Sequence, residues 1–209
     1  LHEGQDAIFT DIAFEVSVRT LIDNGYLAPL ISKRMGTELD VSRVGMRGGE
    51  FIAKDLEAAV DQEAITLGAV EEILAYGEER KSWLVFCAGV DHAFHVRDAI
   101  RTRGITCATI VGDTPSAERE AIIQAFKAGQ IRCLTNANVL TTGFNAPAVD
   151  LIAMLRPTQS AGLYVQIVGR GCRLADGKQN CLVLDFAGNV KRHGPIDAIH
   201  PKRPGKGEG

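Results

Sequence analysis

Five consecutive apolar residues, Trp83 to Cys87, limit the possible folds more than any other segment of the chain. An uninterrupted apolar run of this length is typical of a parallel strand that is buried on both faces. After it, strand and helix patterns alternate: strands are predicted at 106–111, 131–135, 150–155 and 180–184, and helices at 91–103, 116–128 and from 158 onward. Alternation of this kind builds βαβ units with right-handed connections. We therefore expect an α/β fold with three layers around a doubly wound, mostly parallel sheet.

The segment before this alternation is less regular. Its patterns predict a helix at 14–22, a strand at 28–34, a loop or hairpin at 41–51, and helices at 53–60 and 65–76. The last residues are rich in Pro, Gly and Lys, which is typical of a linker. We therefore expect three parts: residues 1–77 as an extension partly packed on the core, 78–195 as the main domain, and 196–209 as a flexible tail.

Composition narrows the functional classes. Of the 209 residues, 45% are hydrophobic and 23% charged, as in a globular protein with a substantial core. There is no apolar run of membrane-spanning length and no secretory signal, so we expect a cytoplasmic protein. Five scattered cysteines without a C-x-x-C pair indicate reduced core thiols rather than zinc ligands. The pair His92 and His95 lacks a third nearby ligand, so no metal site is expected.

The net charge of −3 argues against nucleic-acid binding through bulk charge. Any such binding would use backbone amides, hydroxyls and a local groove. In a parallel sheet, ligands bind where the strands end, at their carboxyl edge. Small, hydroxyl and amide residues gather there in this sequence, and they would let backbone N–H groups approach a phosphodiester. The alternative is that such residues are simply those that loops use.

A second motif is the sequence Gln166 to Arg173, which reads Q-x-x-G-R-x-x-R. On a helix, Gln166, Arg170 and Arg173 would recur at i, i+4 and i+7 and share one face. Two guanidiniums on one face, with Gly169 and Gly171 leaving room beside them, match phosphate oxygens. The alternative is a surface helix whose arginines pair with carboxylates. Glycine is a poor helix former that a purely structural helix would avoid, which favours the phosphate interpretation.

Q-x-x-G-R-x-x-R is similar to motif VI of superfamily 2 helicases and translocases, motors built from two RecA-like domains. The resemblance implies that Arg170 and Arg173 are arginine fingers and that Gln166 helps to position the nucleotide. It also implies ATP and Mg²⁺ as cofactors, held mainly by a first RecA-like domain of the same chain. No G-x-x-x-x-G-K-[ST] or D-E-x-[DH] sequence is present, so we expect an excised second domain that hydrolyses no ATP alone.

Other segments strengthen the resemblance. Val85-Phe86-Cys87 looks like motif IV, and Leu134 to Asn145 looks like motif V. The resemblance implies that Gly143, Asn145 and Gly169 face the nucleotide, although Asn145 stands where the family commonly has Asp. It implies nucleic-acid contacts by residues at the strand ends: Phe86, Cys87, Ala88, Gly112, Asp113, Thr135, Asn136, Thr141 and Thr142.

Further segments, such as Leu184 to Asn189, resemble the bacterial RadD-like repair helicases. The resemblance implies a monomeric DNA helicase or translocase in DNA repair, with DNA favoured over RNA and no membrane partner. Three alternatives remain open. The chain could be a non-catalytic nucleic-acid-binding RecA-like module, or the translocase domain of a restriction-enzyme subunit. It could also be a Rossmann-type enzyme, although no G-x-G-x-x-G follows the first strand.

Overall fold

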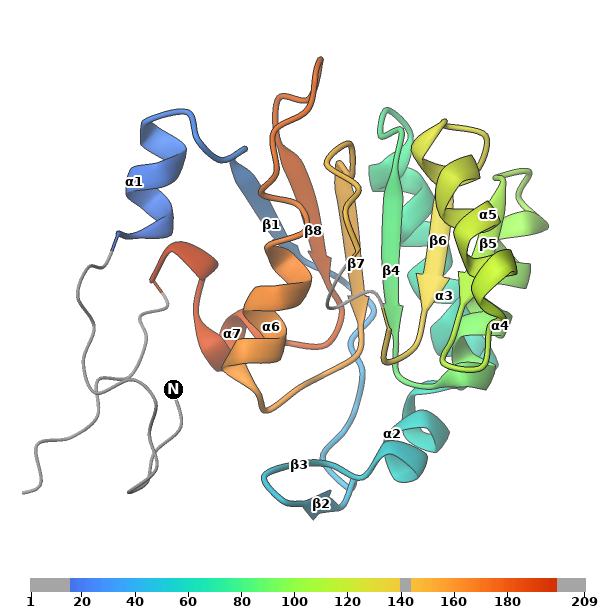
Figure 1. Cartoon of the computed structure of the whole chain (residues 1–209). Helices are drawn as coiled ribbons and strands as arrows, with labels where there is room; N and C mark the ends of the chain where they lie inside the picture. The colour runs from blue at the N-terminus through green and yellow to red at the C-terminus, as the bar shows by residue number, and fades with distance from the viewer. Residues whose placement is uncertain (1–15, 140–143, 199–209) are drawn as a thin grey trace, which may run out of the picture.

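The computed structural model describes residues 16–139 and 144–198. Its centre is a six-stranded parallel sheet with strand order β1-β8-β7-β4-β6-β5 (Figure 1). The strands are β1 (Leu30–Arg34), β4 (Trp83–Cys87), β5 (Cys107–Ile110), β6 (Cys133–Asn136), β7 (Leu151–Leu155) and β8 (Cys181–Asp185). The predicted α/β fold is confirmed.

Helices cover both faces of the sheet. They are α1 (Val18–Asp23), α2 (Ala53–Val60), α3 (Glu63–Gly77), α4 (Val90–Arg101), α5 (Ser116–Lys127), α6 (Ala161–Val168), α7 (Asn189–His193) and the 3-10 turn η1 (Ile196–Ala198). One hydrophobic cluster joins the sheet to α2, α3 and α4, and a second joins it to α5 and α6. Because each cluster lies between the sheet and one layer of helices, the fold has the three predicted layers. None of the helices in the described ranges is both long and apolar enough to cross a membrane.

Strand β4 shows why the sheet forms. All five of its residues are buried. Trp83, Val85 and Cys87 belong to the cluster under α3 and α4, whereas Leu84 and Phe86 belong to the cluster under α5 and α6. Side chains alternate between the faces of a strand, so a strand with apolar residues at every position is stable only between two helical layers.

The described residues before residue 78 contribute a strand to the same sheet. β1 pairs in parallel with β8, from Leu30 opposite Cys181 to Arg34 opposite Asp185. The predicted loop or hairpin at 41–51 is a short antiparallel hairpin of β2 (Met46–Arg47) and β3 (Glu50–Phe51). Helix α2 has its predicted bounds, and α3 contributes Val70 and Ile73 to the core. The predicted division into extension, domain and tail stays a prediction.

Candidate functional site

Helix α6 ends before the two arginines of the Q-x-x-G-R-x-x-R motif. Ser160 caps its start by accepting a hydrogen bond from the Leu163 amide, and the helix ends at Val168 with Gly169 as its C-cap. Turns follow, in which Arg170 N donates to Ile167 O in an i to i−3 pattern. The expectation of one helical face carrying Gln166, Arg170 and Arg173 was therefore wrong. Glycine is a poor helix former, and Gly169 and Gly171 both fall in this stretch, so the chain continues in turns although Gly169 itself keeps right-handed angles.

The two arginines nevertheless converge. Nη1 of Arg170 and Nη1 of Arg173 both donate to the backbone oxygen of Phe144, the latter at 2.9 Å. Arg173 also donates to Oδ1 of Asn145 at 2.9 Å. Arg170 is buried, and burial, with a smaller contribution from the charge of Arg173, lowers the pKa of its guanidinium. Two positive charges are thus fixed side by side against the connection between β6 and β7.

Among the other residues predicted to contact the nucleotide, Asn145 bonds directly to Arg173. Asn145 and Gln166 are exposed, and Gly169 is half-buried. Gly143 lies outside the described residues, as do Thr141 and Thr142. Because Asn145 is neutral, its contact with Arg173 is a hydrogen bond rather than an ion pair. The positive charge of Arg173 is therefore not offset at this contact, as it would be by Asp.

The two glycines of the motif have a different role from the one expected. A Cβ on Gly169 would lie 2.8 Å from the backbone oxygen of Val165. A Cβ on Gly171 would lie 2.5 Å from Sγ of Cys181 and 3.2 Å from Cδ1 of Ile152. Contacts below 3.0 Å are not tolerated without movement. The glycines therefore allow close packing of the motif on its own helix and on the sheet, and do not leave room beside the guanidiniums.

Lys178 stabilises the backbone on both sides of the arginine pair. Its Nζ donates to the backbone oxygens of Pro147, Gly171 and Arg173, at 3.0, 2.8 and 2.8 Å. Burial lowers the pKa of its ammonium group. The side chain thus joins the end of the β6–β7 connection to the segment that carries Arg173. Sequence analysis did not identify Lys178, because a lysine in a loop carries no pattern that reveals distant carbonyl partners.

The residues predicted to bind nucleic acid divide into two groups. Gly112 and Asp113 are exposed beyond the end of β5, whereas the other described members of the set are buried: Phe86, Cys87, Ala88, Thr135 and Asn136. Oγ1 of Thr135 lies 2.7 Å from Oγ1 of Thr109, and Asn136 donates to Val85 O at 2.9 Å. These side chains hold strands together, since they lie within β4 and β6 or directly after β4. In this conformation they have no direct access to a polymer.

The two histidines near the end of β4 have separate partners. The buried His92 accepts a hydrogen bond from the Ala88 amide through Nδ1, at 3.3 Å. The exposed His95 contacts the carboxylate of Asp61 at 2.9 Å, and this contact raises the pKa of its imidazole. Within ranges 16–139 and 144–198, no three His, Cys, Asp or Glu side chains are arranged to hold a metal ion. All five cysteines are free and buried, as expected for core thiols.

Comparison with known proteins places this geometry in a family. The model of the helicase conserved C-terminal domain matches residues 66–175, more than half of the chain. A Schizosaccharomyces pombe protein, assigned as the mitochondrial ATP-dependent helicase irc3, is 36% identical over 68% of this chain and 25% of its own length. A Saccharomyces cerevisiae protein, assigned as the ATP-dependent helicase IRC3, is 29% identical over 87% of this chain and 27% of its own length. This chain therefore spans about a quarter of the length of these relatives.

Solved structures show the same fold. One is a fragment assigned as the HsdR subunit of a type I restriction enzyme from Vibrio vulnificus YJ016, with a TM-score of 0.68 and 22% identity. The match covers 90% of this chain and 38% of the fragment. The E. coli DEAD-box protein SrmB, bound to regulator of ribonuclease activity A, covers 61% of this chain and is covered to 76%, with a TM-score of 0.52 and 17% identity. The narrower resemblance to RadD-like repair helicases stays a prediction. The chain belongs to the helicase conserved C-terminal domain family, the second RecA-like domain of superfamily 2 helicases.

Proposed function

We propose that this chain is the second motor domain of an ATP-dependent DNA helicase or translocase. In this proposal, Arg170 and Arg173 act on ATP that is bound with Mg²⁺ by a first RecA-like domain. The convergence of both guanidiniums beside Asn145 carries the proposal. Guanidinium groups match the geometry of phosphoryl oxygens, so two of them side by side suit an anion bound between the domains. A role in DNA repair and a cytoplasmic location remain predictions.

The geometry suggests how each arginine would act. Arg173 donates to Phe144 and Asn145 through Nη1, and a guanidinium carries three further N–H groups on Nε and Nη2. Those groups would bind phosphoryl oxygens of the γ-phosphate and stabilise charge that develops in the transition state. Arg170 is more deeply buried and would mainly contribute its positive charge. Closure of the two domains would bring the pair to the nucleotide, so ATP hydrolysis would depend on domain closure.

The polymer is proposed to lie on the exposed loop at Gly112 and Asp113. DNA is favoured over RNA because the restriction-enzyme subunit covers more of this chain than the DEAD-box protein does. Hydrolysis and reopening of the domains would then move the loop along the strand. The chain alone is expected to hydrolyse no ATP, since it contains neither the phosphate-cradling loop nor the magnesium-binding carboxylates of a motor domain.

The test is the ATPase activity of the full-length parent protein with no polymer, single-stranded DNA, duplex DNA or RNA. Removal of an arginine finger lowers kcat by roughly 10³ to 10⁵, so Arg170→Ala and Arg173→Ala should abolish stimulated turnover while ATP binding persists. Arg97→Ala is the control, because Arg97 is a surface arginine of α4 paired with Asp98. If turnover is indifferent to both site substitutions, the arginines only fasten the β6–β7 connection and the domain is a binding module.

A further inference from the structure

A groove opens on the carboxyl edge of the sheet, where β1 and β8 end. Its volume is about 400 Å³, and it is lined by residues 32–34, 38, 39, 41, 185–188 and 190–192. We call it the β1–β8 groove. It is separate from the arginine pair, because Lys178, which precedes β8, donates to the backbone of Arg173 at the other end of that strand.

The groove has an excess of positive charge. Four basic side chains line it, namely Lys33, Arg34, Lys191 and Arg192, against two carboxylates, Glu38 and Asp185. Both carboxylates have partners within the protein. Glu38 accepts from Nε of Arg34 at 2.7 Å. Asp185 accepts from the amides of Ala187 and Val190, at 3.2 and 2.7 Å. Lys191 is exposed at the groove. Lys33 is also exposed, and its Nζ lies 4.4 Å from the ring centroid of Tyr76.

The β2–β3 hairpin stands beside the groove and extends its basic surface. Figure 1 shows the hairpin beyond the carboxyl ends of the strands. Glu50 fastens it to the start of α6 by accepting from Oγ1 of Thr158 at 2.6 Å and from the Gln159 amide at 3.0 Å. Arg192 lies 5.8 Å from the ring centroid of Phe51 and so joins the groove to β3. Arg47 is exposed on β2, and Arg43 is exposed in the turn that precedes the hairpin.

We propose that the β1–β8 groove and the β2–β3 hairpin bind the phosphodiester backbone of a nucleic acid. The inference rests on the proposed function and extends its polymer site. Gly112 and Asp113 lie on the same sheet edge, beyond β5 at the far end of the strand order. At about 4.8 Å per strand, β1 and β5 are roughly 24 Å apart. A phosphate chain with a charge about every 3.4 Å covers that span with about seven nucleotides, and no single nucleotide does.

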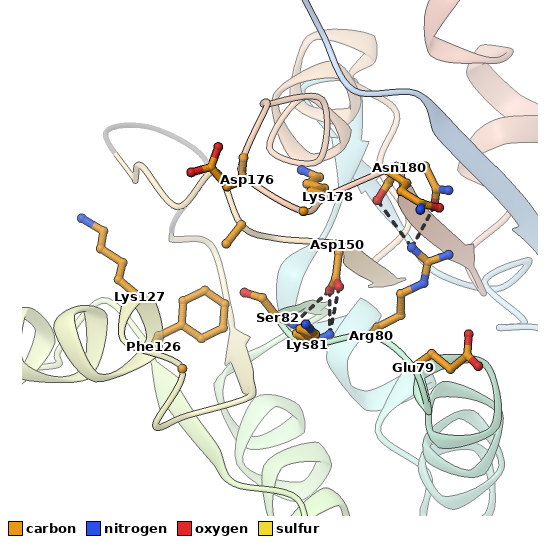
Figure 2. Close-up of a pocket in the computed structure, with 15 residues that line it drawn as sticks. Glu79, Arg80, Lys81, Ser82, Phe126, Lys127, Asp150, Asp176, Lys178 and Asn180 are labelled. Carbon is orange, nitrogen blue, oxygen red and sulfur yellow. Dashed lines mark hydrogen bonds between the residues drawn. The ribbon is translucent and has the colours of Figure 1, made fainter.

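The opposite edge of the sheet provides a matched control. Figure 2 shows a hollow at the amino ends of β4, β7 and β8, with a volume of about 360 Å³. Its basic and acidic side chains are mixed. The carboxylate of Asp150 accepts from the amides of Lys81 and Ser82, and Arg80 donates to Asn180. Exposed Lys81 and Lys127 lie there, so reversing their charges changes the net charge by the same amount without touching the groove.

The experiment measures binding of this chain to fluorescein-labelled oligodeoxythymidine and to a labelled duplex, across a salt series. Three variants are compared with the unsubstituted chain: Lys33→Glu with Lys191→Glu in the groove, Lys81→Glu with Lys127→Glu at the amino edge, and Gly112→Glu in the β5 loop. A Cβ at Gly112 meets no atom within 4 Å, so that substitution should fold. Urea denaturation of each variant checks that folding is intact.

The groove variant should bind at least about tenfold more weakly near physiological salt. Its plot of log K against log salt should be flatter by about 0.7 to 0.9 for each lost phosphate contact. The amino-edge variant should bind within about twofold of the unsubstituted chain. For oligonucleotides shorter than about seven nucleotides, the difference in affinity between the groove variant and the unsubstituted chain should be smaller. Such short probes cannot reach both the β1–β8 groove and the β5 loop.

The outcomes separate the inference from the proposed function. If Gly112→Glu weakens binding and the groove variant does not, the groove is overturned and the polymer site of the proposed function stands. Equal losses in the groove and amino-edge variants also overturn the groove, since they would report net charge alone. If the unsubstituted chain binds neither probe at low salt, both the groove and the β5 loop fail as polymer sites. An acidic protein partner would then be the better occupant of the groove.

Discussion

The two edges of the sheet use positive charge in different ways. At the amino edge, Arg132 donates to the backbone oxygens of Gly77, Glu78 and Arg80, and Lys178 donates to three others. At the carboxyl edge, Lys33 and Lys191 are exposed beside a groove. Arg132 and Lys178 replace water as donors to loop carbonyls, so these two amino-edge cations belong to the fold. The net charge of −3 conceals this division, because a count of charges does not tell which cations are already bound by the protein.

The largest expected effect of this difference is on stability. Arg132→Gln removes three hydrogen bonds from a guanidinium and its contact with the Trp83 ring, 4.6 Å from the centroid. Hydrogen bonds to charged groups contribute about 1.5 to 3 kcal/mol each, and partial exposure reduces the sum. We expect a loss of about 3 to 4 kcal/mol in the free energy of unfolding, measured by urea denaturation. Lys33→Gln at the carboxyl edge should lower it by no more than about 1 kcal/mol, since it loses only the contact of Nζ with the Tyr76 ring, 4.4 Å from the centroid.

A loss of equal size in both variants would contradict the comparison. It would mean that exposed cations at the groove also support the fold. A small loss in Arg132→Gln would mean instead that water satisfies the three carbonyls when the guanidinium is gone.

The carboxyl edge also contains a buried group whose effect on stability depends on pH. Burial lowers the pKa of His92 from 6.5 to about 4, while the charge of Asp61 raises it and that of His95 lowers it further. The unfolded chain therefore binds more protons between these values. The contribution of neutral His92 to the free energy of unfolding is complete above pH 6.5 and is lost as the pH falls toward 4. The loss is about 3 kcal/mol at about 1.4 kcal/mol per pKa unit.

Urea denaturation at several pH values between 7 and 4 measures this loss. In His92→Gln the fall in stability over this range should be smaller than in the unsubstituted chain. His95→Gln should have the opposite and smaller effect, because the pKa of His95 is raised by Asp61 and its side chain is exposed. Parallel curves for the unsubstituted chain and His92→Gln would show that His92 does not titrate in this window.

These effects indicate what sequence alone could and could not predict. The apolar run of β4 and the bounds of α2 follow from local patterns, because burial on one or two faces leaves a periodic signal. Contacts across the chain leave no such signal. Glu50 contacts Thr158 from 108 positions away, and Lys178 contacts Pro147 from 31 positions away. Their partners are backbone groups, which every residue has, and a hydroxyl group, which several residue types can supply.

The arginine motif illustrates both cases. The spacing of Arg170 and Arg173 correctly indicated that the two guanidiniums would lie together. The prediction assumed that the helix continues through Arg173, whereas α6 ends at Val168. They meet because both donate to Phe144 O. The strand-end residues show the reverse. Thr135 has the polarity of a binding residue but lies within β6, so its hydroxyl bonds to Thr109 inside the sheet.

Lys178 tests whether an amino-edge cation also supports the site. Lys178→Met keeps the length of the side chain and removes three hydrogen bonds to carbonyls. The lowered pKa shows that burial already costs the charged form some free energy, so the loss of stability should be modest, about 1 to 2 kcal/mol. In the full-length parent, kcat of the stimulated ATPase should fall more than KM rises, since Arg173 would lose its fixed position relative to Asn145.

The conservative variant Lys178→Arg separates positioning from stability. It keeps a donor and a positive charge, so it should restore part of the stability, but a planar guanidinium cannot reproduce three bonds from one nitrogen. If kcat in Lys178→Met falls only as far as the fraction of folded protein falls, Lys178 is a structural cation like Arg132. If kcat falls at full folding and Lys178→Arg recovers stability better than kcat, the amino edge sets the position of the arginine pair. Lys178 would then be both a structural cation and one that positions the arginine pair.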